Sequence, residues 1–435
     1  MRELRAPTPA MLTDHYELTM VEAALRSGAG DRRCVFEVFA RSLPGRRRYA
    51  VVAGLGRLLD ALADFRFDDD AIRYLESADV VDAPSREWLA AYRFTGSIDA
   101  YPEGEIYFPN SPVLTVEGSF AECVVLETLV LSVLNHDSAV ATAAARMVCA
   151  AGDRPCIEMG SRRTHEAAAI AAARAAYIGG FASTSNLAAG DRWDIPTTGT
   201  AAHAFTLVHD DEIAAFRAQV ESLGNDTTLL VDTYDVEQGI RAAVDVAGPK
   251  LGAIRLDSGD LPTQARDARR LLDELGAHQT RIVVTSDLDE FAIAALAAAP
   301  VDGYGVGTSV VTGSGVPTAG FVYKLVARET ADGWRPVEKR SPGKPSRGGR
   351  KQAARRLDAN GTAVAEVLRI DPAGVGDGER ALQVRVVADG EVLGAASLQQ
   401  ARDRCRRSMQ ELPAAAMKLS PGDPAIDTLW EIDEG

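Results

Sequence analysis

The sequence predicts an α/β protein that combines an incomplete or irregular (β/α) barrel with a mixed α/β domain formed by the N-terminal and C-terminal segments. Two observations support this prediction. Between residues 150 and 306, short apolar or β-branched runs alternate with amphipathic helical segments, the pattern of βα units around a parallel sheet. The regions before residue 120 and after residue 330 contain strand and helix patterns without this repeat.

We expect three parts. The chain has 435 residues, 46% of them hydrophobic, enough for two or three domains. Residues 1–119 are expected to form the N-terminal mixed α/β domain, residues 120–330 the catalytic α/β barrel, and residues 331–435 a basic loop and a C-terminal segment that packs on the N-terminal domain. Apolar spacing and turn residues predict the following elements in the first part: a helix capped by Thr13 or Asp14, strands at 34–40 and 49–53, a helix at 55–65, and strands at 106–108 and 113–116.

Composition excludes several classes of function. A net charge of -15 and a pI near 5.0 argue against a nucleic-acid-binding surface. The five cysteines form no CxxC pair and are odd in number, so neither a zinc site nor a disulfide framework is indicated, and a reducing cytoplasm is expected. No stretch of about 18 uncharged apolar residues stands out, and no basic region followed by an apolar run begins the chain. We therefore expect neither export nor a membrane partner.

The predicted barrel begins with two helices at 122–134 and 138–151, neither of which contains an internal glycine or proline. Strand-like runs then recur at a spacing that suits a barrel. They lie at 156–159, 180–182, 194–196, 228–231, 251–256, 281–285 and 302–306, with 321–326 as a further strand.

A polar signature follows each of these runs. In α/β barrels the loops after the strands form the catalytic face, so the signatures are expected to converge on one mouth. Singly, many of them have a structural interpretation, and for Thr184, Ser286 and Asp289 we favour helix capping or loop structure. Together they bring arginines, carboxylates, a histidine and a glycine-rich turn to one place, which indicates a site for an anionic, polyhydroxylated substrate.

Three of these signatures carry the chemistry. His203 ends a run of small residues and presents a titratable imidazole, although a structural histidine is the ordinary alternative. The Gly305-x-Gly307-Thr308 turn follows a late strand, where barrel enzymes often bind phosphate through backbone N–H groups. Arg255 and Asp257 are two residues apart on a strand and therefore point to the same side, either toward a ligand or into a mutual salt bridge.

The signatures together resemble those of the nicotinate phosphoribosyltransferase family. The resemblance spans residues 11–355 in unbroken order, and the C-terminal part is less similar. The residues that carry it are Leu12-Thr13-Asp14-x-Tyr16-x-Leu18-Thr19-Met20, Glu158-x-Gly160-x-Arg162-Arg163, Thr184-Ser185-Asn186, Gly199-Thr200-x-Ala202-His203, Asp232-Thr233-Tyr234-Asp235, Arg255-x-Asp257-Ser258-Gly259-Asp260, Gly305-x-Gly307-Thr308 and Tyr323-Lys324-Leu325-Val326.

The resemblance implies a reaction that joins nicotinate to 5-phosphoribosyl 1-diphosphate with coupled ATP hydrolysis, and Mg²⁺ is expected with the diphosphate. It implies that His203 is phosphorylated, with Asp232 as the residue that orients it, and that both are catalytic. Tyr16 is implied to stack on the pyridine ring in the site of a neighbouring subunit, so the expected assembly is a homodimer. The other implied substrate-binding residues are Arg162, Ser185, Thr200, Arg255, Asp257, Gly307 and Thr308.

Few residues decide whether the pyridine substrate is nicotinate or nicotinamide. Nicotinamide-specific relatives carry an aspartate at the position of Ser185; serine accommodates a substrate carboxylate, and Arg162 is available to assist it. Met159 stands where relatives usually have an aromatic residue and is expected to pack on the ring instead. The alternatives are nicotinamide phosphoribosyltransferase, quinolinate phosphoribosyltransferase, a non-catalytic sugar-phosphate-binding barrel, and a Schiff-base aldolase that would need Lys324.

The C-terminal part opens with a basic Gly/Pro-rich stretch at 340–356. It is either a solvated connector or a flap that contacts ATP or diphosphate. Strands are expected at 363–370 and 382–387, and a helix at 398–412.

Overall fold

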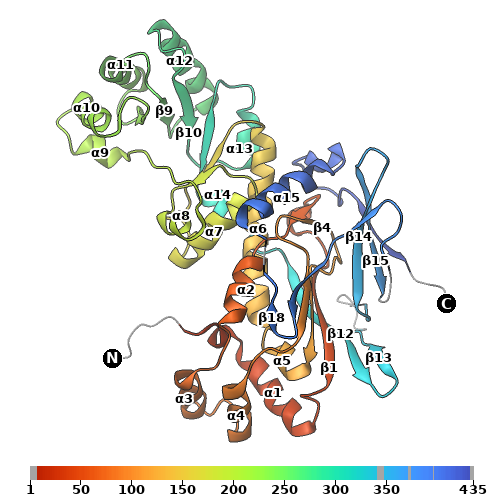
Figure 1. The fold of residues 1–435 in the computed structure, drawn as a ribbon. Helices are drawn as coiled ribbons and strands as arrows, with labels where there is room; N and C mark the ends of the chain where they lie inside the picture. Colours follow the sequence, from red (N-terminus) through yellow and green to blue (C-terminus); the bar gives the residue numbers. More distant parts are fainter. Residues whose placement is uncertain (1–6, 340–346, 371–373, 395, 432–435) are drawn as a thin grey trace. The chain divides into compact units, whose positions relative to one another are not determined.

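The computed structural model describes residues 7–339, 347–370, 374–394 and 396–431, which form two compact units (Figure 1). The first unit comprises Met1–Ala139 and Val316–Gly435, and the second comprises Val140–Gly315. The N-terminal and C-terminal segments therefore share one unit, as expected. The observed boundaries follow Ala139 and Gly315, whereas boundaries were expected near residues 120 and 330. They differ because the segments 120–139 and 316–330 pair and pack within the first unit.

The first unit is built on a seven-stranded sheet with the strand order β13-β12-β1-β5-β3-β17-β18. Strand β12 (Phe321–Thr330) pairs antiparallel with β1 (Arg33–Ala40), so the prediction that 321–326 adds a strand to the barrel is wrong. It contains both buried and partly exposed residues, which suits a sheet with one covered face better than a barrel wall covered on both faces. The other strands of this sheet are β13 (Gly333–Pro336), β5 (Leu114–Ser119), β3 (Ser97–Ala100), β17 (Val384–Ala388) and β18 (Glu391–Val392).

The predicted N-terminal elements are present in this unit. Helix α1 (His15–Ser27) begins after Asp14 and ends at Gly28, whose φ of +73° forms a left-handed cap. The strands predicted at 49–53 and 106–108 pair with each other rather than with the strand at 113–116. They are β2 (Ala50–Val51) and β4 (Ile106–Tyr107), and the helices are α2 (Leu55–Ala63), α3 (Asp69–Ser77) and α4 (Ala83–Ala91).

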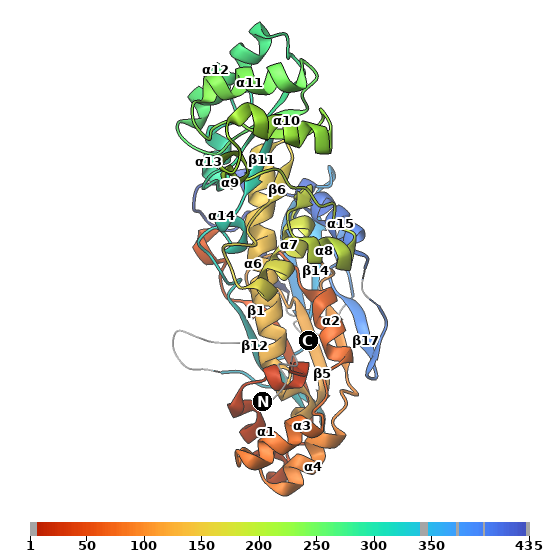
Figure 2. The ribbon, with the colours of Figure 1, turned by 90° about the vertical axis from the view of Figure 1, so that its left-hand side faces the viewer.

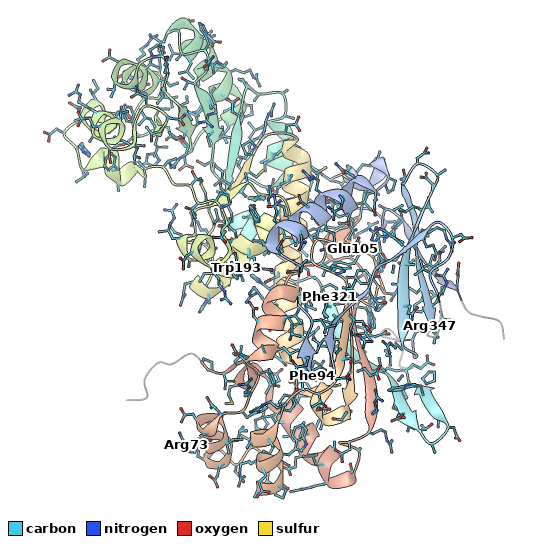
Figure 3. All side chains as sticks on the ribbon, in the orientation of Figure 1. Arg73, Phe94, Glu105, Trp193, Phe321 and Arg347 are labelled. Carbon is cyan, nitrogen blue, oxygen red and sulfur yellow. The ribbon has the colours of Figure 1, made fainter. Side chains whose placement is uncertain are left out.

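The C-terminal segment packs on the N-terminal part, as predicted, because β17 pairs with β3. The unit's apolar core includes Phe94 and Phe321, both labelled in Figure 3. A four-stranded sheet and helix α15 (Leu398–Gln410) complete the segment. The strands of this sheet, in spatial order, are β16 (Glu379–Ala381), β14 (Lys351–Leu357), β15 (Ala363–Ile370) and β19 (Asp427–Glu431).

Part of the predicted basic loop is a strand. Residues 340–346 lie outside the described residues, whereas β14 covers most of the remainder. Within β14, Lys351 and Arg355 are buried and pair with Glu37 and Glu366. These two cations therefore hold the C-terminal segment in place and are not available as a phosphate-binding flap.

One long helix replaces the two that were predicted before the barrel. After the short α5 (Phe120–Val124), α6 runs from Glu127 to Ala151 without a break. Two polar residues near the expected break have partners outside the helix: Asp137 accepts from Arg57 at 2.8 Å, and Ser138 Oγ donates to the carbonyl of Ala53 at 3.1 Å. Because these side chains have partners, the helix continues through them.

The stretch Phe120–Ala151 is long and apolar enough to cross a membrane when judged by length and composition alone. Its most apolar 18-residue window has a mean hydropathy of 1.4, and 67% of that window is buried inside the described structure. Core helices meet the same criteria, so this is weak support for a membrane span.

The second unit contains the predicted parallel sheet. Its six strands are all parallel and lie in the order β7-β6-β11-β10-β9-β8, with helix α11 packed between α10 and α12 (Figures 1 and 2). The strands are β6 (Cys156–Glu158), β7 (Ser183–Thr184), β8 (Thr228–Leu230), β9 (Ala253–Leu256), β10 (Arg281–Val284) and β11 (Gly303–Val306). The helices are α7 (Glu166–Ile178), α8 (Leu187–Trp193), α9 (His203–Leu207), α10 (Glu212–Leu223), α11 (Val236–Ala247), α12 (Leu261–Glu274), α13 (Glu290–Ala295) and α14 (Thr308–Val311).

Two predicted barrel strands are absent from this unit's described residues. The run at 180–182 precedes β7, because Gly180 has a φ of +111° and closes helix α7. The run at 194–196 begins with Asp194 in a left-handed conformation, at φ +53°, and only Thr197 beyond it forms a bridge with Thr184. No strand closes the sheet between β7 and β8, so the barrel is incomplete, as predicted.

Candidate active site

The polar signatures of the second unit gather at one edge of its sheet. Because the six strands are parallel, their carboxyl ends all lie at that edge. The residues that follow the strands, in spatial order, are Ser185 after β7, Met159 after β6, Gly307 after β11, Thr285 after β10, Asp257 after β9 and Asp232 close to the end of β8. The predicted convergence is confirmed for these residues.

We had expected the run of small residues before His203 to be a strand; instead, His203 is the first residue of helix α9. Its Nδ1 lies 3.1 Å from Thr233 Oγ1. Its Nε2 lies 3.8 Å from Asp232 Oδ1 and 3.9 Å from Asp257 Oδ2, and the side chain is 40% exposed. The imidazole therefore has a hydroxyl on one nitrogen, two carboxylates near the other, and access to solvent.

Asp232 is held rigidly beside this imidazole. Its side chain is 1% exposed, and its Oδ2 accepts hydrogen bonds of 2.9 Å from the backbone N of Asp257 and from Ser258 Oγ. Its Oδ1, the oxygen nearest His203, is buried without a hydrogen-bond partner. The 3.8 Å between His203 Nε2 and Asp232 Oδ1 exceeds hydrogen-bonding distance. Asp232 therefore lies near His203 in this structure without the hydrogen bond that an orienting residue would make.

Arg255 and Asp257 do not form a salt bridge with each other, although both lie in the described part of the chain. Arg255 Nη1 donates to Thr200 Oγ1, and Asp257 Oδ1 accepts from Thr285 Oγ1. The pKa of Arg255 is lowered, chiefly by burial and also by the nearby cation Arg162, while Asp257 and Asp232 oppose that shift. Two guanidinium groups near each other favour an anionic ligand between them.

Glu158 joins the ends of β6 and β7. Its buried carboxylate accepts from Thr184 Oγ1 and from the backbone N of Gly160, and burial raises its pKa. The backbone N of Ser185 donates to the carbonyl of Glu158 at 2.8 Å. The structural interpretation of Thr184 is confirmed, and Glu158 fixes the loop that carries Ser185.

Asp289 is a helix cap, as we favoured. Its Oδ1 accepts from the backbone N of Phe291 at 2.9 Å and of Ala292 at 2.8 Å. Ser286 adopts a φ of +115°, which places it in a strained turn before that cap.

The glycine-rich turn is shaped by close packing. Gly307 caps the single-turn helix α14, which begins at Thr308. A Cβ placed on Gly305 would lie 2.5 Å from Thr285 Cγ2 and 2.8 Å from Met159 Sδ. Met159 therefore lies directly over Gly305, so the residue that stands in place of the usual aromatic touches the predicted phosphate turn.

We expect Gly305→Ala to destabilise the protein by about 1–3 kcal/mol, the usual cost of overpacking. The added methyl must displace Met159 or Thr285, and Thr285 holds Asp257. Thermal and urea unfolding would measure the loss. Gly199→Ala is a suitable control, because a Cβ there meets nothing within 4 Å. Equal stability of the two variants would contradict the tight packing at Gly305.

Tyr16 belongs to the first unit, not to the unit that carries the other predicted site residues. It lies in the first turn of α1 and its side chain is 46% exposed. Burial and the nearby carboxylate of Glu127 raise the pKa of Tyr16. Sequence reasoning missed Thr233 and Thr285 as partners of the predicted site residues His203 and Asp257. Thr233 stood within a quoted signature, but a threonine beside an aspartate is too common to single out.

The second unit's fold and site define an enzyme class: α/β proteins with a parallel sheet that act on an anionic substrate at the carboxyl ends of the strands. Residues 11–135 match the family model described as the nicotinate phosphoribosyltransferase N-terminal domain. The chain is 59% identical over 430 residues to nicotinate phosphoribosyltransferase pncB1 of Mycobacterium tuberculosis, covering 96% of this chain and 94% of that protein. It is 40% identical over 326 residues to nicotinate phosphoribosyltransferase of Bacillus subtilis, covering 73% and 66%.

The fold agrees with these relatives. The crystal structure of human nicotinic acid phosphoribosyltransferase superposes with a TM-score of 0.82 at 26% identity and covers 97% of both chains. The chain belongs to the nicotinate phosphoribosyltransferase family, whose members are phosphoribosyl-transfer enzymes. The family resemblance inferred from its sequence motifs is confirmed.

Proposed function

We propose that this chain joins nicotinate to 5-phosphoribosyl 1-diphosphate, giving nicotinate mononucleotide and diphosphate in a salvage route of NAD biosynthesis. ATP hydrolysis is coupled to the reaction through phosphorylation of His203. Family membership supports the overall reaction. The observation that carries the proposed mechanism is the exposed imidazole of His203 beside Asp232 and Asp257, at the edge that also holds Arg255.

The protein groups bind and orient the substrate more than they react with it. Departure of diphosphate leaves positive charge on the ribose ring, so the site must hold the diphosphate and aim the pyridine nitrogen at C1. We assign the phosphate oxygens to Arg255, Thr200 and the turn at Gly307 and Thr308. Asp257, which is 35% exposed, is placed to accept the ribose hydroxyls.

Mg²⁺ fits this donor set. No group of three or more His, Cys, Asp or Glu side chains in the described ranges could hold a metal ion alone, but Mg²⁺ commonly binds through one or two carboxylates and substrate phosphates. Asp257 would hold it, with the unpartnered oxygen of Asp232 nearby. When bound, Mg²⁺ neutralises charge on the diphosphate.

Phosphorylation of His203 balances as a simple displacement. A neutral imidazole nitrogen attacks the γ-phosphorus of ATP, the bond to the β,γ-bridging oxygen breaks, and ADP leaves. Water later hydrolyses the N–P bond. Asp232 would stabilise the positive charge that forms on the ring, because it is fixed in place and has one oxygen without a partner.

Ser185 favours nicotinate over nicotinamide. A carboxylate at this position would repel the substrate carboxylate, whereas a serine does not, and Arg162 contributes positive charge to the same mouth. Nicotinamide phosphoribosyl transfer is the alternative reaction. A sugar-phosphate-binding barrel without activity is the alternative from another class.

We also propose a homodimer in which Tyr16 reaches the ring-binding site of the neighbouring subunit. Its support is the half-exposed side chain of Tyr16, next to an equally exposed Leu12. A cytoplasmic location is proposed with it and is supported by five free cysteines.

The function is tested by incubating the purified protein with Mg²⁺, 5-phosphoribosyl 1-diphosphate, γ-labelled ATP and either nicotinate or nicotinamide. We expect nicotinate mononucleotide from nicotinate, no product from nicotinamide, and acid-labile label on the protein. Product from nicotinamide alone would favour the alternative reaction. A protein that binds 5-phosphoribosyl 1-diphosphate but forms no product would favour the non-catalytic barrel.

A further inference from the structure

Glu158, the last residue of β6, is a buried carboxylate that the proposed mechanism does not use. It is fully buried, and no cation pairs with it among the residues that the structure describes. Burying a charge without a cation is costly unless hydrogen bonds compensate for the lost water. Here one carboxylate oxygen accepts from the backbone N of Gly160 and the other accepts from Thr184 Oγ1. These two donors follow or end different strands, so the carboxylate links the ends of β6 and β7.

The hydroxyl of Thr184 connects Glu158 to the next loop. It accepts from the backbone N of Asn186 at 3.0 Å, and a backbone N–H can only donate. The hydroxyl proton is therefore free to be donated to Glu158. An ionised carboxylate accepts at both oxygens and so matches two donors, whereas a side-chain amide in its place would bring N–H groups against one of them. Glu158 thus sets the direction of the hydrogen bonds that hold residues 184–186.

Two further hydrogen bonds join the same two loops. The backbone N of Ser185 donates to the carbonyl of Glu158 at 2.8 Å. Asn186 Nδ2 donates to Ser161 Oγ at 3.0 Å. Ser161 directly precedes Arg162 in the chain, and Asn186 directly follows Ser185. The backbone positions of Arg162 and Ser185 are therefore set by one connected group of hydrogen bonds, with the carboxylate of Glu158 at its buried side.

We propose that Glu158 is a positioning residue for nicotinate, because it holds the loops that carry Arg162 and Ser185 in a fixed relation to each other. This inference rests on the proposed function, in which those two residues receive the substrate carboxylate. Glu158 does not touch substrate in this account. It acts through the two loops: when they are ordered before binding, less of the binding energy is spent on ordering them. The phosphate oxygens are assigned to other residues, so the effect should be confined to the pyridine substrate.

Glu158→Gln in the full chain tests the proposal, because it keeps the shape of the side chain and replaces one acceptor with a donor. We expect KM for nicotinate to rise about threefold to tenfold, the range for one lost hydrogen bond, with KM for 5-phosphoribosyl 1-diphosphate and kcat unchanged. Thr184→Val, which removes the connecting hydroxyl, should have the same selective effect. Thr184→Ser keeps the hydroxyl and should retain a KM for nicotinate close to that of the unaltered chain.

Glu290→Gln is the matched control. Glu290 begins α13 in the same unit, is also buried, and accepts from Arg146 Nε at 3.0 Å and from Ser314 Oγ. It contributes to the hydrogen bonds of other elements, so its replacement should lower the urea unfolding midpoint without changing the ratio of the two KM values. A selective rise in KM for nicotinate in this variant would show that any buried glutamate of the unit has this effect, and would overturn the proposal.

The decisive result is the variant that combines Glu158→Gln with Thr184→Val. If the two side chains act through their shared hydrogen bond, the combined rise in KM for nicotinate is smaller than the product of the two single effects. Independent effects, or an equal rise in KM for both substrates, would overturn the proposal. Urea unfolding midpoints of the same proteins report the contact without substrate. If the unaltered chain forms no nicotinate mononucleotide, the proposed function has failed and this inference falls with it; if product forms and only the midpoints change, the inference alone has failed.

Discussion

Replacing His203 with alanine is expected to abolish acid-labile labelling of the protein by γ-labelled ATP. ATP-stimulated formation of nicotinate mononucleotide should fall about 100-fold or more, a barrier increase of about 2.7 kcal/mol. The physical reason is that alanine leaves no nitrogen to accept the phosphoryl group beside Asp232 and Asp257. The measurement is steady-state turnover with and without ATP, together with quantification of protein-bound label.

The variant is suited to a clear outcome because the His203 side chain is 40% exposed, so its removal leaves no large buried cavity. His278→Ala is the matched control: that histidine is also exposed and has a carboxylate neighbour, Asp273, but it lies beyond α12. It should keep full labelling and turnover. Undiminished labelling in His203→Ala would show that another residue carries the phosphoryl group.

Replacing Arg355 with methionine is expected to lower the free energy of unfolding by about 3 kcal/mol, the lower part of the range for breaking a buried ion pair. Arg355 and Glu366 are both fully buried, with Nη2 and Oε2 2.8 Å apart. Without the arginine, Glu366 keeps hydrogen bonds from Tyr101 and Ser111 but has lost its charge partner. Two nitrogens of Arg355, Nε and Nη1, have no hydrogen-bond partner, so the pair is imperfect and the upper part of the range is not expected.

Urea unfolding would measure this loss as a lower midpoint with an unchanged slope. Arg241→Met is the control: Arg241 pairs with Glu237 one helical turn away on the exposed face of α11, where such pairs contribute about 0.3–0.5 kcal/mol. Adding Glu366→Leu to Arg355→Met should recover part of the stability, because it removes the unpaired buried carboxyl group. A loss below about 1 kcal/mol for Arg355→Met would mean that water reaches this network.

Most of the fold could be predicted wherever local pattern and tertiary role agree. The parallel strands β6, β8, β9, β10 and β11 were found, because strands covered on both faces are short apolar runs between helices. The pattern failed at 321–326, where an apolar run looks the same in a barrel and in an antiparallel sheet. It failed again within α6, because the sequence does not show that Asp137 and Ser138 find partners on other elements.

For the candidate site, too, local sequence predicted some features and tertiary packing decided the others. The sequence by itself determined which chemical groups stand after each strand, and thereby the family, because each signature is a short run of neighbouring residues. Only the tertiary structure decided that Thr233 rather than Asp232 meets His203 at hydrogen-bonding distance, and that Arg255 and Asp257 bind separate threonines. These contacts join residues distant in sequence or depend on which way a side chain turns. Their distances are set by packing, which no local pattern records.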